Sequence, residues 1–125
     1  MANRTQKLAQ EFNRAVACYQ AGKFSEAEQI CQQLVSAKRD FFDALRVLAV
    51  VQATQGKHAL ALASYDRALA LRPNDAEALS NRGNALCRLG RYQQALMSYD
   101  RALVIQADHP EALQNRGMAL LALGR

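Results

Sequence analysis

The chain has 125 residues, of which half are apolar, 6% are aromatic and none is tryptophan. Sixteen basic and 11 acidic residues give a net charge of +5, which is too mild and too evenly spread to indicate a nucleic-acid binder. There is no run of 18 apolar residues and no apolar signal stretch at the N-terminus, so we expect no membrane span and a cytoplasmic protein.

Apolar residues recur at the spacing of amphipathic helices along the chain. Residues 1–7 are polar and basic, and they predict a disordered or frayed lead-in. Leu8, Phe12 and Tyr19 then begin a helical pattern that ends near Gly22, which suits the left-handed backbone after a helix. Continued in this way, the pattern predicts an all-α protein with seven helices, at residues 8–21, 24–37, 41–55, 58–71, 75–89, 92–105 and 110–123.

Three of these helices are preceded by a residue that can accept a hydrogen bond from exposed amides, with an acid three positions later. Each pair resembles a capping box, in which the acid also favours the positive end of the helix. Pro110 fits this interpretation, since proline is tolerated in a first helical turn. The pairs are Asp40 with Asp43, Asn74 with Glu77, and Asp108 with Glu111.

The chain repeats itself every 34 residues. The phrase NDAEALSNRGNALCRLG at residues 74–90 recurs as DHPEALQNRGMALLALG at 108–124, and SYDRAL occurs at 64–69 and 98–103. A fixed period of this length decides the architecture, because each unit can bury its apolar face only against its neighbours. Four glycines follow the same period: Gly22, Gly56, Gly90 and Gly124.

The period and its small residues resemble the tetratricopeptide repeat, over roughly residues 8–125. The resemblance implies an α-solenoid of antiparallel helix hairpins wound into a right-handed superhelix. Its units would be 8–41, 42–75, 76–109 and a partial unit at 110–125. In this phase Gly83 lies at a close helix contact, so Gly83→Leu should be strongly destabilising. The matching positions are Ala15, Ala49, Gly83 and Gly117 in the first helices, Ala27, Ala61 and Ala95 in the second, and an aromatic position holding Tyr65 and Tyr99 but Cys31 in the first unit.

The number of helices is odd, and the last one, at 110–123, carries little charge. One interpretation is that this helix caps the array, but caps usually have a polar outer face. We therefore expect a fragment of a longer array, with self-association through helix 110–123.

No motif in the sequence indicates catalysis, so we expect no enzyme activity, no cofactor and no metal ion. Cys18 and Cys31 lie at packing positions and are expected to be reduced core residues. Cys87 lies one residue beyond such a position and is expected to be partly exposed. Asp66 and Asp100, each followed by an arginine, are best explained by a solvated helix face.

The resemblance also places the first helix of each unit on a concave groove. Asn13, Asn81 and Asn115 then occupy one position in units 1, 3 and 4, where unit 2 has Val47. A side-chain amide both donates and accepts, so such a row can bind a peptide backbone of any sequence. The row is similar to the asparagine ladder of O-GlcNAc transferases, and replacing Asn81 and Asn115 with alanine should weaken binding. The groove candidates are Asn13, Arg46, Val47, Glu77, Ser80, Asn81, Asn84, Glu111, Asn115 and Met118.

The family's clamp for the C-terminal carboxylates of chaperone tails is not expected here, because it needs a set of lysine, asparagine and arginine side chains that this chain lacks. In one register the matching positions are Phe12, Val16, Val47, Glu77 and Asn81, and in the next they are Arg46, Val50, Asn81, Glu111 and Asn115.

The sequence therefore predicts a non-enzymatic interaction scaffold that binds a protein or peptide in the concave groove. The alternative is a substrate-recognition arm of a larger glycosyltransferase, since the repeated wording is similar to that of bacterial proteins that join such arrays to a transferase domain.

Overall fold

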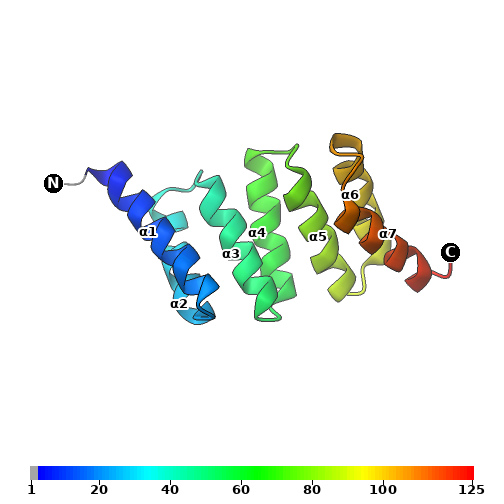
Figure 1. Ribbon diagram of the computed structural model, residues 1–125, viewed down its shortest axis with the longest axis horizontal. Coiled ribbons are helices and arrows are strands. Elements are labelled where there is room, and N and C mark those ends of the chain that lie inside the picture. The colour runs from blue at the N-terminus through cyan, green and yellow to red at the C-terminus, as the bar shows by residue number, and fades with distance from the viewer. Residues whose placement is uncertain (1–2) are drawn as a thin grey trace.

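The computed structural model describes residues 3–125, and over this range the regular structure consists of seven α-helices and no strand. Successive helices form a row of hairpins, with the two chain ends at opposite ends of the molecule (Figure 1). All predicted helices are confirmed, and from α2 onward each begins and ends within one residue of its predicted bounds. The helices are α1 (Arg4–Gln20), α2 (Phe24–Ala37), α3 (Phe42–Thr54), α4 (His58–Leu71), α5 (Ala76–Arg88), α6 (Tyr92–Ile105) and α7 (Pro110–Ala122).

Glycine ends the first helix of every hairpin in the left-handed conformation, as predicted. Gly22, at φ 79°, donates its backbone N–H to the carbonyl of Tyr19, and Lys23 donates to the carbonyl of Cys18. These two bonds satisfy helix carbonyls that would otherwise lack a donor. Gly56, Gly90 and Gly124 have the same conformation, so the turn recurs with the period of the sequence.

The predicted lead-in at residues 1–7 is wrong for residues 4–7, which form the first turn of α1. The Asn3 side chain accepts from the Gln6 amide at 2.8 Å while the Gln6 side chain accepts from the Asn3 amide at 3.0 Å. This capping box starts the helix earlier than the apolar pattern indicates. Arg4 also donates to the Ala37 carbonyl at 2.6 Å, which fixes the start of α1 against the end of α2. Residues 1 and 2 of the predicted lead-in lie outside the described residues.

The three predicted capping boxes are wrong by one residue. Asp75, rather than Asn74, accepts from a backbone amide at the start of α5, and His109, rather than Asp108, does so at the start of α7. Pro110 gives the reason in α7, because a residue before proline is held in an extended conformation and must stand outside the helix. The residue before α3 is Phe41, which makes no capping bond and instead packs on Phe12, with ring centroids 5.5 Å apart.

The helices form an inner and an outer layer. Every helix packs against its neighbours in the chain, and in addition α1 contacts α3, α3 contacts α5 and α5 contacts α7. Among residues 3–125, no such contact joins α2 to α4 or α4 to α6. The odd-numbered helices therefore lie on the shorter, inner side of the row, and the even-numbered helices spread apart on the outer side.

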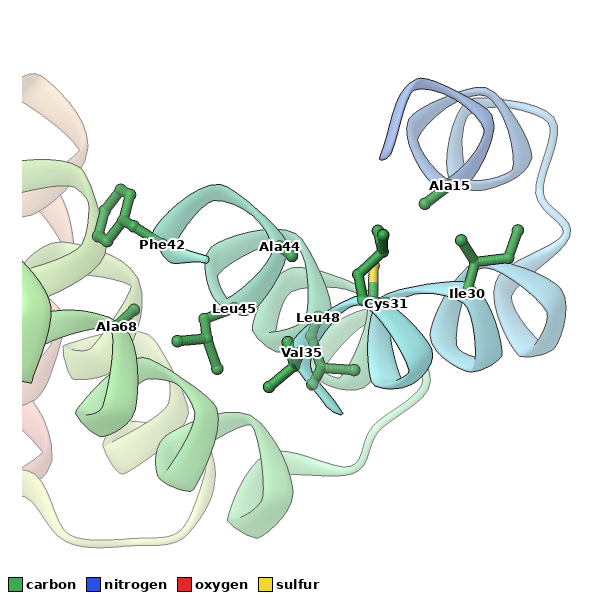
Figure 2. Packing of buried hydrophobic residues seen from close by; sticks show 10 residues of the cluster. Ala15, Ile30, Cys31, Val35, Phe42, Ala44, Leu45, Leu48 and Ala68 are labelled. Atoms are coloured by element: carbon green, nitrogen blue, oxygen red, sulfur yellow. The ribbon is translucent and has the colours of Figure 1, made fainter. Parts of the chain in front are cut away.

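The core is a string of clusters between successive helices rather than one centre, as expected for a repeat array. Figure 2 shows the first cluster, which includes Ala15 of α1, Cys31 of α2, and Leu45 and Leu48 of α3. The small residues predicted at helix contacts, such as Ala15 and Ala27, are fully buried. Tyr65 and Tyr99 are also buried, which confirms the aromatic position of the repeat.

The three cysteines are free thiols. Cys31 is buried as predicted, and burial raises the pKa of its thiol to about 11, which keeps it protonated. Cys87 is half-buried as predicted. Cys18 packs against the first core cluster as predicted, but it is only half-buried, because α1 is covered on one side only, by α2 and α3.

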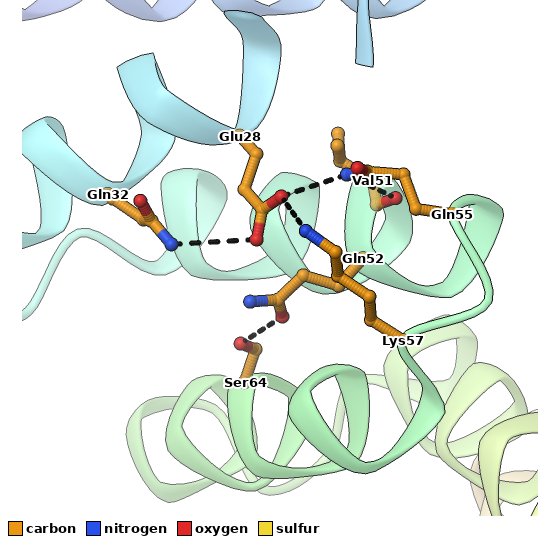
Figure 3. A network of polar contacts seen from close by, with 7 residues as sticks. All are labelled: Glu28, Gln32, Val51, Gln52, Gln55, Lys57 and Ser64. Atoms are coloured by element: carbon orange, nitrogen blue, oxygen red, sulfur yellow. Dashed lines mark hydrogen bonds and ion pairs between the residues drawn. The ribbon is translucent and has the colours of Figure 1, made fainter. Parts of the chain in front are cut away.

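One junction between units is polar. Glu28 of α2 is almost completely buried, and its carboxylate accepts hydrogen bonds from Lys57 at 2.7 Å and Gln55 at 3.0 Å (Figure 3). Leu62 and Leu96 take the place of Glu28 in the later units. The bond with Lys57 is the main reason why the pKa of Glu28 lies below its usual value, although burial opposes the shift.

Candidate functional site

The inner surface is made by the face that α1, α3, α5 and α7 turn away from the outer helices. An ion pair crosses it between α3 and α5, where Arg46 and Glu77 lie 4.0 Å apart. Both were groove candidates, and the structure brings them together. Asn13 and Glu111 are exposed, whereas Val47 and Asn81 are half-buried, so these four candidates are accessible to different degrees.

Ser80 does not line this surface, contrary to the prediction. Its side chain is 1% exposed, and its hydroxyl has no hydrogen-bond partner in the described residues. Arg46, the equivalent residue one unit earlier, is long enough to reach the surface from the same place on the helix, and the short serine side chain is not.

A hydrogen-bonded network joins α5, α6 and α7 at one end of the inner surface. The Tyr99 hydroxyl donates to Asn84 Oδ1 at 2.6 Å, and Asn115 Nδ2 donates to the same oxygen at 2.9 Å. The Cys87 thiol lies 3.6 Å from the Tyr99 hydroxyl. Burial, helped by Cys87, raises the pKa of Tyr99 well above its usual value, so the phenol stays protonated and acts as the donor.

This network fixes the direction of two amide groups. Asn84 Oδ1 accepts two hydrogen bonds, so the Asn84 N–H groups are left to point elsewhere. Asn115 uses one N–H and keeps its carbonyl oxygen. Within residues 3–125, no side chain or backbone group binds Asn84 Nδ2 or Asn115 Oδ1, so the network leaves one donor group and one acceptor without a partner.

The network borders a cavity of about 570 Å³ between α5 and α7. A second cavity, of about 720 Å³, lies elsewhere on the molecule. Met118, at the edge of the cavity between α5 and α7, is 60% exposed and supplies an apolar side chain. Sequence analysis found Asn84, Asn115 and Met118 but missed the rest of the lining, because those residues come from α6 and from the ends of α5 and α7. The lining is Asn84, Cys87, Arg88, Tyr92, Tyr99, Asn115, Met118, Ala119 and Ala122.

The predicted asparagine row is not uniform. Asn115 binds Asn84, but the position of Asn84 is taken by Val16 in unit 1, by Val50 in unit 2 and by Met118 in unit 4. Of the three asparagines in the row, only Asn115 therefore has an asparagine of the preceding unit as its neighbour. Near Asn81 the buried group is the Tyr65 hydroxyl, whose pKa is raised by burial.

Two ion pairs on the outer side recur with the period of the sequence, and sequence analysis missed them. Asp66 accepts from Arg82 Nε at 2.6 Å, and Asp100 accepts from Arg116 Nε at 2.6 Å. Both acids are exposed as predicted, but each binds an arginine in the next unit rather than its neighbour in the sequence. The signal was present, since the acid of SYDRAL and the arginine of NRG are 16 residues apart in both copies.

Neither a metal site nor a membrane span is found in the described part of the chain. Between residues 3 and 125, no three histidine, cysteine, aspartate or glutamate side chains are grouped so that they could hold a metal ion. None of the helices in this range combines the length and the apolar character needed to cross a bilayer.

Comparison with known proteins identifies a repeat family and several structures of the same fold. The model of the tetratricopeptide repeat matches residues 46–110 and 80–125, while comparison with curated sequences gives no significant match. A solved structure described as the first TPR of Spaghetti (RPAP3) bound to the HSP90 peptide SRMEEVD has a TM-score of 0.92 and 23% identity, over 96% of this chain and 95% of that one.

Two further structures cover nearly the whole chain. A mutant O-GlcNAc transferase from Thermobaculum terrenum gives a TM-score of 0.86 with 26% identity over 96% of this chain, which spans 23% of the transferase. The translocator chaperone SycD from the type III secretion system of Yersinia enterocolitica gives a TM-score of 0.86 with 19% identity, over 98% of this chain and 87% of that one.

Proposed function

The chain belongs to the tetratricopeptide repeat family, whose fold forms protein-interaction domains, and from this premise we propose that it binds an extended peptide segment along the inner surface of α1, α3, α5 and α7. The binding involves no chemical reaction. The partner lies across the surface and bonds to side chains that the helices hold in fixed positions.

The observation that carries this proposal is the pair of amides at Asn84 and Asn115. A peptide backbone offers one carbonyl and one N–H per residue, and it needs a donor and an acceptor in return. The network with Tyr99 fixes Asn84 and Asn115 and leaves the Asn84 N–H groups and the Asn115 carbonyl without a partner among the described residues. Because these groups are already oriented, little conformational entropy is lost when the peptide binds.

The adjoining cavity gives the peptide a place for a side chain. Met118 and Tyr92 supply apolar surface, and Arg88 lies at its edge. Met adapts its shape to different partners more readily than a branched side chain does. The surface would therefore bind the peptide backbone through specific hydrogen bonds and would accept a range of peptide side chains.

The structure of the RPAP3 repeat shows a peptide of sequence SRMEEVD on this fold. The inner surface of the present chain has Glu77 and Glu111 where the family's carboxylate clamp would need a cation in the two registers considered. We therefore expect SRMEEVD to bind no more tightly than the same peptide with an amidated C-terminus.

The test uses a fluorescein-labelled library of random dodecapeptides, from which the tightest binder is selected by fluorescence polarisation. The variant is Asn84→Asp, because a carboxylate still accepts from Tyr99 and Asn115 but no longer donates to a peptide carbonyl. We expect the affinity for the selected peptide to fall about tenfold, the loss of one well-made hydrogen bond.

The matched control is Asn74→Asp, which makes the same change of charge in the exposed loop before α5. It should leave the affinity within about twofold of the parent chain. If Asn84→Asp binds the selected peptide as tightly as the parent chain does, while its melting temperature is unchanged, the inner surface near Asn84 is not the binding site.

A second function, as the substrate-recognition arm of a larger glycosyltransferase, is supported by the likeness to the Thermobaculum terrenum O-GlcNAc transferase, in which a segment of this size makes up 23% of the chain. The row of Asn13, Asn81 and Asn115 is the feature that would serve such an arm. The test is the sequence of the reading frame after Arg125. A transferase domain in that frame supports this function, and a stop codon contradicts it.

The inner surface is not the only candidate for contacts between proteins. Leu113 of α7 is 50% exposed, whereas its equivalents Leu79 and Leu45 are fully buried beneath the second helix of their own hairpins. Leu121, eight residues after Leu113 in α7, is also exposed. As a further part of this proposal, two copies of the chain associate through α7, each covering the apolar side chains of the other.

A further inference from the structure

The outer side of the array contains a groove between α2 and α4, with α3 beneath it. Its volume is about 720 Å³. It lies on the opposite layer from the inner surface, since α2 and α4 are outer helices that do not contact each other. The residues that line it are Gln32, Val35, Ser36, Arg39, Leu45, Leu48, Arg67, Ala70 and Leu71.

The groove results from a break in the repeat. In the two later junctions an aspartate of the outer helix and an arginine of the next inner helix form a close ion pair, as in Asp66 with Arg82. The residues 34 positions before that pair are Gln32 and Leu48, which cannot form an ion pair. The side chains that bridge the later junctions are thus missing from the first one.

Two guanidinium groups stand at this groove without a partner. Arg39 and Arg67 are exposed, and in the described part of the chain neither makes an ion pair. None of the residues that line the groove is acidic. Arg39 is specific to this junction, because its equivalents are Pro73 and Ala107.

The floor of the groove is apolar. Val35, Leu45 and Leu48 lie together between α2, α3 and α4 (Figure 2), and all three are buried. At the rim, Leu71 is 40% exposed and Ala70 is also exposed. A side chain that enters between α2 and α4 would therefore meet aliphatic surface, with a cation on each side.

We infer that the outer groove binds an acidic peptide segment, in which an aliphatic side chain packs on Leu71 and flanking carboxylates pair with Arg39 and Arg67. Guanidinium groups bind carboxylates with two parallel hydrogen bonds, which gives such a contact direction as well as charge. The inference does not depend on the proposed function, since it concerns the opposite layer of the array.

The probe is a fluorescein-labelled nonapeptide with one central leucine and glutamates on both sides, and binding is followed by fluorescence polarisation at low salt. We expect Arg39→Ala together with Arg67→Ala to weaken binding about tenfold, since two ion pairs are lost. The matched control is Arg101→Ala, because Arg101 is exposed and occupies the position of Arg67 in the next unit. It should leave the affinity unchanged.

A second variant restores the missing ion pair. Gln32→Asp with Leu48→Arg reproduces the Asp66 and Arg82 arrangement, and it should close the groove and abolish binding of the probe while the helical circular dichroism is kept. Amide shifts in the nuclear magnetic resonance spectrum of the parent chain should map to the end of α2 and to α4.

Three results would overturn the inference. One is an equal loss of affinity in Arg101→Ala, which would show general attraction to a basic protein. Another is equally tight binding of a nonapeptide with lysines in place of glutamates, which would show that the carboxylates do not matter. The third is a set of amide shifts confined to α5 and α7, together with a loss of probe binding in Asn84→Asp.

Discussion

Gly83 lies at a close contact between the two helices of one hairpin. A Cβ atom added there would lie 2.6 Å from a ring carbon of Tyr99, which is far inside contact distance. The Tyr99 ring cannot easily move away, because its hydroxyl is bonded to Asn84 and the ring is fully buried. The contact explains the small residue at this position of the repeat.

We predict that Gly83→Ala lowers the melting temperature by roughly 2–8 °C. Alanine favours the helix by about 1 kcal/mol, but the overpacking against Tyr99 costs about 1–3 kcal/mol. The matched control is Gly117→Ala in α7, where the added Cβ would meet no atom within 4 Å. That variant should melt at a slightly higher temperature. Thermal unfolding followed by circular dichroism measures both, and equal shifts would contradict the packing argument.

At the scale of the elements, the junction between α2 and α3 differs from the later ones because it is polar. Glu28 binds Lys57 and Gln55 in a place where the other units have leucine. Ser64 of α4 extends the network by donating to Gln52 at 2.7 Å. A buried network of this kind is satisfied only when the right helices meet, so it favours one order of packing over others.

We predict that this junction makes the chain sensitive to acid. The bond with Lys57 lowers the pKa of Glu28 in the folded state, so its contribution to stability is complete above the ordinary glutamate pKa of about 4.3 and is lost as the pH falls through the lower folded-state pKa. The free energy of unfolding should therefore fall more between pH 7 and pH 3 in the parent chain than in Glu28→Gln.

Urea unfolding at several pH values measures this difference. Glu26→Gln is the matched control, since Glu26 is exposed and its ion pair with Arg14 is long, at 3.9 Å. Its pH dependence should follow that of the parent chain. If the free energy of unfolding depends on pH in the same way in the parent chain and in Glu28→Gln, the charge of Glu28 does not contribute to stability.

At the scale of the whole molecule, the terminal helix α7 exposes the apolar side chains of Leu113, Met118 and Leu121. We predict that the mass measured by light scattering after size exclusion rises from one chain toward two over a roughly hundredfold range of concentration. Leu113→Gln with Leu121→Gln should keep the chain monomeric. Val104→Gln, at an exposed position of α6, is the control and should associate as the parent chain does. A constant monomer mass for the parent chain would contradict the self-association.

Much of the architecture follows from the sequence because it depends on local or repeated features. The turn at each glycine is a property of a few consecutive residues, and the helices follow from the apolar pattern. The identity of the core positions follows from the period, since a residue such as Ala61 must repeat the surroundings of Ala27 and Ala95. These features need no knowledge of how the helices are placed in space.

Only the tertiary structure decided which polar groups meet. The bond between Asn84 and Asn115 spans 31 residues, and the pair of Asp66 with Arg82 spans 16, so both depend on the angle at which one helix crosses the next. Ser80 is buried because its side chain is too short to extend past the side chains around it to the surface. Helix periodicity places a residue on a face, but distances of about 3 Å between side chains are set by packing.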